Sequence, residues 1–114
     1  MTIKEVKGIL DFAKENGIDV LDTASGYGNS EKVLGEVGVD NYQIITKTIS
    51  LKNGVDRVID GFYQSLDDLS QKQVEGLLIH NIQDIENKQF SALFNKLNEL
   101  KQQGLIKKIG FSTY

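Results

Sequence analysis

Apolar residues recur along this chain at two spacings, one typical of helices and the other of strands. Intervals of three and four run over residues 3 to 16, 55 to 69 and 84 to 103, and predict three amphipathic helices. A shorter helix is predicted from Ser30 to Gly38, with Ser30 as its N-cap, Glu31 in its first turn and a glycine at its end.

Short apolar segments follow each of these helices and predict strands. They are IDVLDT (18 to 23), QIITKT (43 to 48), EGLLIHN (75 to 81) and IKKIGFSTY (106 to 114). The first is expected to be a buried strand. Because helices alternate with strands throughout, we expect an α/β fold with four parallel strands covered by helices, in one domain over residues 1 to 114.

Composition narrows the classes of function. The net charge of −3 argues against a general affinity for nucleic acid, whose phosphates require a basic surface. With no cysteine, the chain has no disulfide framework, thiolate zinc site or cysteine nucleophile, and we predict no metal site. No apolar run reaches the ~18 residues of a membrane span, so a protein of the reducing cytoplasm is expected.

Each of the first three predicted strands ends in an ionisable residue. Asp22, Lys47 and His80 occupy these positions, and Ser112 and Thr113 close the fourth strand. Each residue has an ordinary explanation when taken alone: a turn-forming aspartate, a solvent-facing lysine and a hydrogen-bonded histidine. Parallel strands, however, bring all these positions to the edge where α/β proteins build active sites, so the set predicts such a site.

A tyrosine after the first strand gives this set a chemical role. Reduction of a carbonyl leaves an alkoxide that needs a proton, and a phenol such as Tyr27, with a pKa of ~10, donates poorly unless a cation stabilises its anion. Lys47 supplies such a cation, and Asp22 beside it would keep it charged. His80 would hydrogen-bond the carbonyl oxygen and orient it. Together they predict a proton-delivery unit.

Four segments resemble, in order and spacing, the successive signatures of the aldo-keto reductases. They are GIDVLDTASGYGNSEKVLG, ITKT, LLIHN and GLIKKIGFSTY. The resemblance implies a (β/α)8 TIM barrel that interconverts carbonyls and alcohols with NADPH or NADH, and a catalytic tetrad of Asp22, Tyr27, Lys47 and His80. It also implies that Ser112 contacts the nicotinamide amide, with Thr113 beside it where the family usually has asparagine.

The resemblance covers about half of such a barrel, a partial TIM barrel or half-barrel. The first strand with its glycine-rich turn and the C-terminal half have no counterpart in this chain. In the family, the C-terminal half holds the aromatic residue that stacks on the nicotinamide and the loops that bind the diphosphate and the adenosine ribose. We therefore expect a truncated product or fragment that is inactive alone, with two unpaired strand edges that favour a homo-oligomer or a complementary fragment. Two alternatives remain: a non-catalytic half-barrel that self-associates, and another α/β enzyme that binds a phosphate-bearing ligand through Gly-Tyr-Gly-Asn-Ser.

Overall fold

Helices and strands alternate through the computed structural model, which describes residues 2–24, 29–79 and 82–111. In this part of the chain the order αβαβαβαβ predicted from the sequence is confirmed, with two short 3-10 helices added. The elements are α1 (Ile3–Glu15), β1 (Val20–Asp22), α2 (Ser30–Val37), β2 (Gln43–Lys47), η1 (Leu51–Asn53), α3 (Val55–Leu69), β3 (Val74–Ile79), η2 (Ile82–Glu86), α4 (Phe90–Gln102) and β4 (Ile106–Phe111).

The four strands form one parallel sheet in the order β1-β2-β3-β4, as predicted. Every strand therefore pairs with its neighbour in sequence, and β1 and β4 are the two edges. The register places Asp22 opposite Ile45, Ile45 opposite Gly76, and Gly76 opposite Lys108. All four carboxyl ends lie at one edge of the sheet.

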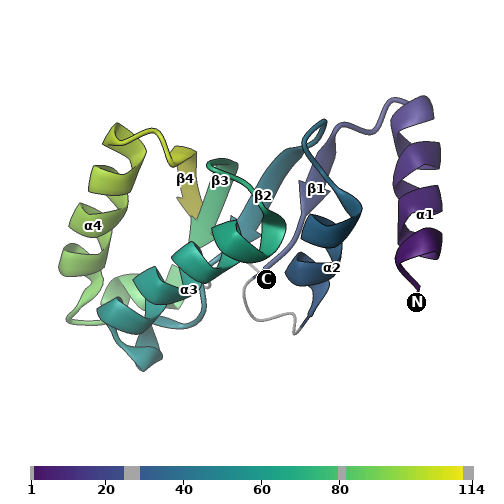
Figure 1. Cartoon of the computed structure of the whole chain (residues 1–114). Helices are drawn as coiled ribbons and strands as arrows, with labels where there is room; N and C mark the ends of the chain where they lie inside the picture. The colour runs from purple at the N-terminus through teal and green to yellow at the C-terminus, as the bar shows by residue number, and fades with distance from the viewer. Residues whose placement is uncertain (1, 25–28, 80–81, 112–114) are drawn as a thin grey trace.

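The helices follow one another along the sheet, α1 beside α2, α2 beside α3 and α3 beside α4 (Figure 1). The core lies between this helical layer and the sheet. Its buried apolar members are Leu10, Val39, Ile44, Leu51, Val58, Phe62, Leu66, Leu69, Val74, Leu77, Ile79, Leu93, Leu97, Leu100 and Ile106. In the part of the chain that the structure describes, no helix is long and apolar enough to cross a membrane.

Helices α2 and α3 approach each other closely at Gly35 of α2. A Cβ atom at this position would lie 1.8 Å from the backbone oxygen of Asp68, near the end of α3. Glycine is therefore required because the backbone of α3 occupies the space of a side chain.

The start of α2 corrects the predicted cap. Asn29, and not Ser30, is the N-cap, because the backbone N–H of Val33 donates to the carbonyl oxygen of Asn29 (3.0 Å) and so makes Ser30 the first helical residue. The predicted end at Gly38 is confirmed, and this glycine adopts φ 96°.

The helix predicted over residues 84 to 103 begins six residues later, at Phe90 of α4. The side chain of Asn87 accepts a hydrogen bond from the backbone N–H of Gln89 (2.8 Å), a local bond that competes with helix formation. The segment before it forms the 3-10 helix η2 instead.

The expectation that IDVLDT is a buried strand is wrong. Ile18 and Val20 are about half exposed, and Asp22 is exposed as well. β1 is an edge strand of three residues with a neighbour on one side, so its side chains are covered less than those of β2 and β3.

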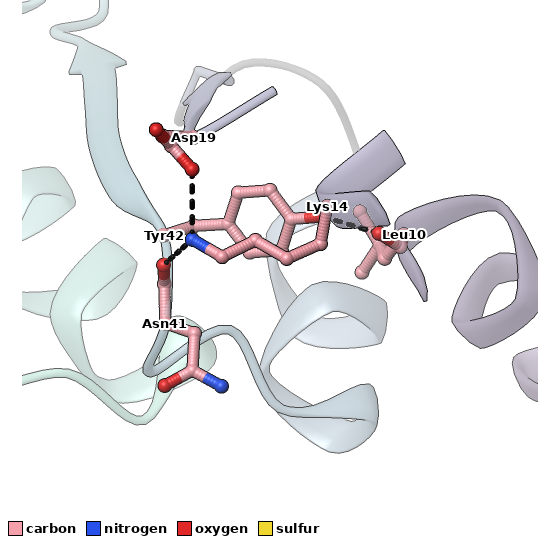
Figure 2. A network of polar contacts seen from close by, with 5 residues as sticks. All are labelled: Leu10, Lys14, Asp19, Asn41 and Tyr42. Atoms are coloured by element: carbon pink, nitrogen blue, oxygen red, sulfur yellow. Dashed lines mark hydrogen bonds and ion pairs between the residues drawn. The ribbon is translucent and has the colours of Figure 1, made fainter. Parts of the chain in front are cut away.

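A network of polar contacts fastens α1 to the amino ends of β1 and β2 (Figure 2). The ammonium of Lys14 donates to the carboxylate of Asp19 (2.9 Å) and to the backbone oxygen of Asn41 (2.7 Å), and it lies 5.1 Å from the ring centre of Tyr42. The hydroxyl of Tyr42 donates to the backbone oxygen of Leu10. α1 is thus held at the amino ends of the strands, opposite to their carboxyl ends.

Candidate active site

Two of the predicted catalytic residues lie where the sequence indicated, at the carboxyl ends of neighbouring strands. Asp22 is the last residue of β1 and Lys47 the last residue of β2. Because Asp22 pairs with Ile45, β2 continues two residues beyond the end of β1, to Lys47. The structure therefore brings a carboxylate and an ammonium to one edge of the sheet.

The same two side chains point away from the helical layer. Thr46 faces the helices, since its hydroxyl contacts a residue of α2, and successive residues of a strand point to opposite faces. Lys47 therefore faces the other side, together with Ile45 and with Asp22, the register partner of Ile45. Lys47 is half-buried and Asp22 is exposed.

The remaining predicted site residues lie outside the described residues. Tyr27 belongs to the segment between β1 and α2, and His80 directly follows Ile79, the last residue of β3. Ser112 and Thr113 come after Phe111, the last residue of β4. Their roles stay predictions.

A hollow of about 480 Å³ opens beside Asp22, between α1, the end of β1 and the start of α2. Apolar side chains of both helices form part of its wall, and Thr23 and Asn29 add polar groups. Thr23 is buried, and its hydroxyl has no hydrogen-bond partner among the described residues. This hollow lies on the helical side of the sheet, whereas Lys47 faces the opposite side.

A buried carboxylate lies behind the sheet, on the side opposite to Lys47. Glu31 of α2 is 3% exposed and accepts hydrogen bonds from the hydroxyls of Thr46 (2.8 Å) and Ser65 of α3 (2.5 Å). Thr46 and Ser65 are buried as well. The sequence indicated Glu31 only as an acidic residue in the first turn of a helix, because the two hydroxyls meet it through tertiary packing.

The segments that follow β2 and β3 are joined to each other at the carboxyl ends of these strands. Asp84 of η2 is buried, and its carboxylate accepts a long hydrogen bond from the backbone N–H of Leu51 in η1 (3.4 Å). Within the described ranges 2–24, 29–79 and 82–111, no group of three or more histidine, cysteine or acidic residues could hold a metal ion.

The family model of the aldo/keto reductases matches residues 1–114, the whole chain. The chain belongs to the aldo/keto reductase family. This assignment leaves the alternative of an unrelated phosphate-binding α/β enzyme without support.

Individual relatives agree with the assignment. Oxidoreductase sirO of Leptosphaeria maculans is 30% identical over 118 residues, which cover 98% of this chain and 35% of sirO. The structure of PA4992 from Pseudomonas aeruginosa, a protein assigned to the aldo-keto reductases, has a TM-score of 0.85 and 26% identity over 99% of this chain and 49% of that one. The holo form of the aldo-keto reductase AKR11C1 from Bacillus halodurans, at 22% identity, shares the fold, with a TM-score of 0.81 over 98% of this chain and 42% of its own.

The aldo/keto reductase chain described here thus spans about half the length of these solved relatives. Its four parallel strands and four helices align with about half of an aldo-keto reductase TIM barrel, which confirms the half-barrel predicted from the sequence.

Proposed function

We propose that this chain carries the proton-delivery residues of an NADPH-dependent carbonyl reduction, with an aldehyde, a ketone or a sugar as substrate. The observation that supports the proposal is the position of Asp22 and Lys47 at the carboxyl ends of adjacent parallel strands, on the same face of the sheet. This is the edge where (β/α)8 enzymes place catalytic groups. The family membership and the lack of cysteine fit a cytoplasmic reductase.

The roles follow from the chemistry of the four side chains. Tyr27 donates a proton to the carbonyl oxygen as the alkoxide forms, and Lys47 stabilises the phenolate that remains. Asp22 keeps Lys47 protonated by its negative charge. His80 donates a hydrogen bond to the carbonyl oxygen and so aims it at the tyrosine.

The exposed carboxylate of Asp22 and the half-buried Lys47 leave this edge accessible, which fits a cofactor that presents its reactive end there. Ser112 and Thr113 are the residues of this chain that would hold the nicotinamide amide. When bound, NADPH supplies the hydride that reduces the carbonyl carbon. Four strands provide part of the family's binding surface, so we propose that the chain alone has low affinity for this cofactor.

The proposed pairing of Tyr27 with Lys47 predicts a measurable change in the titration of the tyrosine. With tyrosine labelled at the ring carbon that bears the hydroxyl, NMR should show Tyr27 losing its proton at lower pH in the wild-type chain than in Lys47→Met. A nearby ammonium stabilises the phenolate, and its removal raises the phenol pKa. Tyr27→Phe assigns the resonance.

Lys52→Met is the matched control, because this exposed lysine lies in η1, outside the proposed unit. It should leave the Tyr27 titration unchanged. If Lys47→Met and Lys52→Met have the same effect on Tyr27, the proposed proton-delivery unit is wrong.

A second candidate function, association with another copy of the chain, rests on the surfaces at the two edges. At the β1 edge, Ile9 and Phe12 of α1 are exposed, Phe12 by 68%. At the β4 edge, Phe94 of α4 and Phe111 are partly exposed, and each ring stacks on that of Phe90 at 6.0 Å between centres. Open strand edges and apolar surface of this kind drive association, and two copies would supply the eight strands of a closed barrel.

We therefore expect the isolated chain to sediment as a dimer or larger species at micromolar concentration, and to oxidise no NADPH above background with a panel of carbonyls. Association would duplicate the four proposed catalytic residues without adding the missing cofactor contacts. Phe12→Ser should shift the distribution toward the monomer, whereas Gln102→Ser, at an exposed position of α4, should not. A wild-type chain that sediments as a compact monomer would contradict the self-association, and turnover would contradict the predicted inactivity.

A further inference from the structure

The buried carboxylate of Glu31 is hydrogen-bonded to the residue that precedes the proposed catalytic lysine in sequence. Glu31 accepts a hydrogen bond from Thr46, and Thr46 directly precedes Lys47 in β2. Its second hydrogen bond, from Ser65, comes from α3. The carboxylate thus joins three elements, α2, β2 and α3, at the carboxyl end of the strand that carries Lys47.

Burial of the Glu31 carboxylate has a desolvation cost that must be compensated. A carboxylate that is 3% exposed loses nearly all of its hydration, and it is tolerated because two hydroxyls and the positive end of α2 compensate its charge. An apolar residue would fill the same space between a helix and a sheet with less need for compensation. The carboxylate makes a directional contact. The hydrogen bond that it accepts from Thr46 restricts the position of the strand more than apolar packing does.

We propose that Glu31 is a positioning residue, which holds the end of β2 through Thr46 so that Lys47 keeps its place relative to Asp22. The inference rests on the proposed function, since it assigns to Glu31 the support of a residue in that site. Thr46 faces the helices and Lys47 the opposite side, so Glu31 acts from behind the sheet and touches neither substrate nor cofactor.

The size of the expected effect follows from Coulomb's law. For an illustrative carboxylate and ammonium about 6 Å apart, a further separation of about 2 Å at an effective dielectric constant near 20 lowers the pKa of the ammonium by roughly half a pH unit. If the Thr46 hydrogen bond sets the position of Lys47, its loss should therefore be visible in the titration of that ammonium.

The test uses the whole chain with ¹⁵N-labelled lysine and follows the Lys47 ammonium by NMR, with Lys47→Met to assign it. Thr46→Val keeps the side-chain volume, removes the hydroxyl and changes no charge. We expect it to move the Lys47 midpoint by about half a pH unit or more. Thr46→Ser, which retains the hydroxyl, should keep the wild-type midpoint.

Ser65→Ala is the matched control. It removes the other hydroxyl from the same carboxylate and should lower the urea midpoint of unfolding as Thr46→Val does, yet leave the Lys47 titration in place. If Thr46→Val does not fold, Thr46→Ala replaces it, because the smaller side chain leaves room for a water molecule at the carboxylate.

Equal midpoints in the wild type and Thr46→Val, or equal shifts in Thr46→Val and Ser65→Ala, would overturn the positioning role and leave Glu31 as a structural contact. The proposed function is judged separately, by the dependence of Tyr27 on Lys47. That dependence can hold while Thr46→Val has no effect, and it can fail while the Lys47 midpoint still moves.

Discussion

Gly35→Ala should lower the free energy of unfolding by more than about 3 kcal/mol. A methyl group at this position would lie 1.8 Å from the backbone oxygen of Asp68 and 2.9 Å from the backbone carbons of Asp68 and Leu69. Overpacking of side chains costs about 1–3 kcal/mol, and here the obstacle is backbone that cannot rotate away. Since domains of this size are stable by about 5–15 kcal/mol, this loss removes a large part of the stability.

Urea denaturation followed by circular dichroism measures this loss, and Gly8→Ala provides the control. Gly8 lies within α1, and a Cβ atom there would have no neighbouring atom within 4 Å. Alanine at this open helical position should raise stability by about 0.5–1 kcal/mol, because glycine is the poorer helix former. A Gly35→Ala chain as stable as the wild type would show that α2 and α3 can separate without cost.

Phe62→Ala should lower the free energy of unfolding by about 3–5 kcal/mol. Phe62 lies in α3, is 1% exposed and is among the largest fully buried side chains of the core. Its truncation removes apolar contacts and leaves a cavity between the helical layer and the sheet that the surrounding backbone can close only in part. The midpoint of urea unfolding, at an unchanged slope, gives the measurement.

The neighbouring aromatic residue makes the comparison specific. Tyr63 follows Phe62 on the same helix, its ring centre is 5.9 Å from that of Phe62, and it is about half exposed. Tyr63→Ala should therefore cost less than about 1 kcal/mol. Equal losses in the two variants would mean that helix propensity, and not burial, determines the effect.

The fold could be predicted where one local signal dominated. The apolar spacing of α3 gave its bounds, Val55 to Leu69, because this helix buries one face along its whole length. The start of α4 could not be predicted, since a hydrogen bond from the backbone N–H of Gln89 to the side chain of Asn87 competes with helix formation there. The exposure of β1 was missed although an unpaired edge was predicted there, because the apolar residues of IDVLDT were read as a sign of burial.

The candidate site, too, could be predicted from the sequence only in part. Asp22 and Lys47 could be found because parallel strands place their last residues at one edge, a rule that needs no three-dimensional coordinates. Glu31, Thr46 and Ser65 are up to 34 residues apart in sequence. Nothing local in the chain indicates that their side chains meet, so this hydrogen-bonded cluster is visible only in the structure.

The network of Lys14, Asp19 and Tyr42 lies at the amino ends of the strands, whereas Asp22 and Lys47 lie at the carboxyl ends. Attachment of α1 and the proposed chemistry therefore depend on different loops. Loops at the carboxyl ends can therefore change in length or sequence without disturbing the contacts that hold α1 at the amino ends. The two ends of the sheet are structurally independent in this respect.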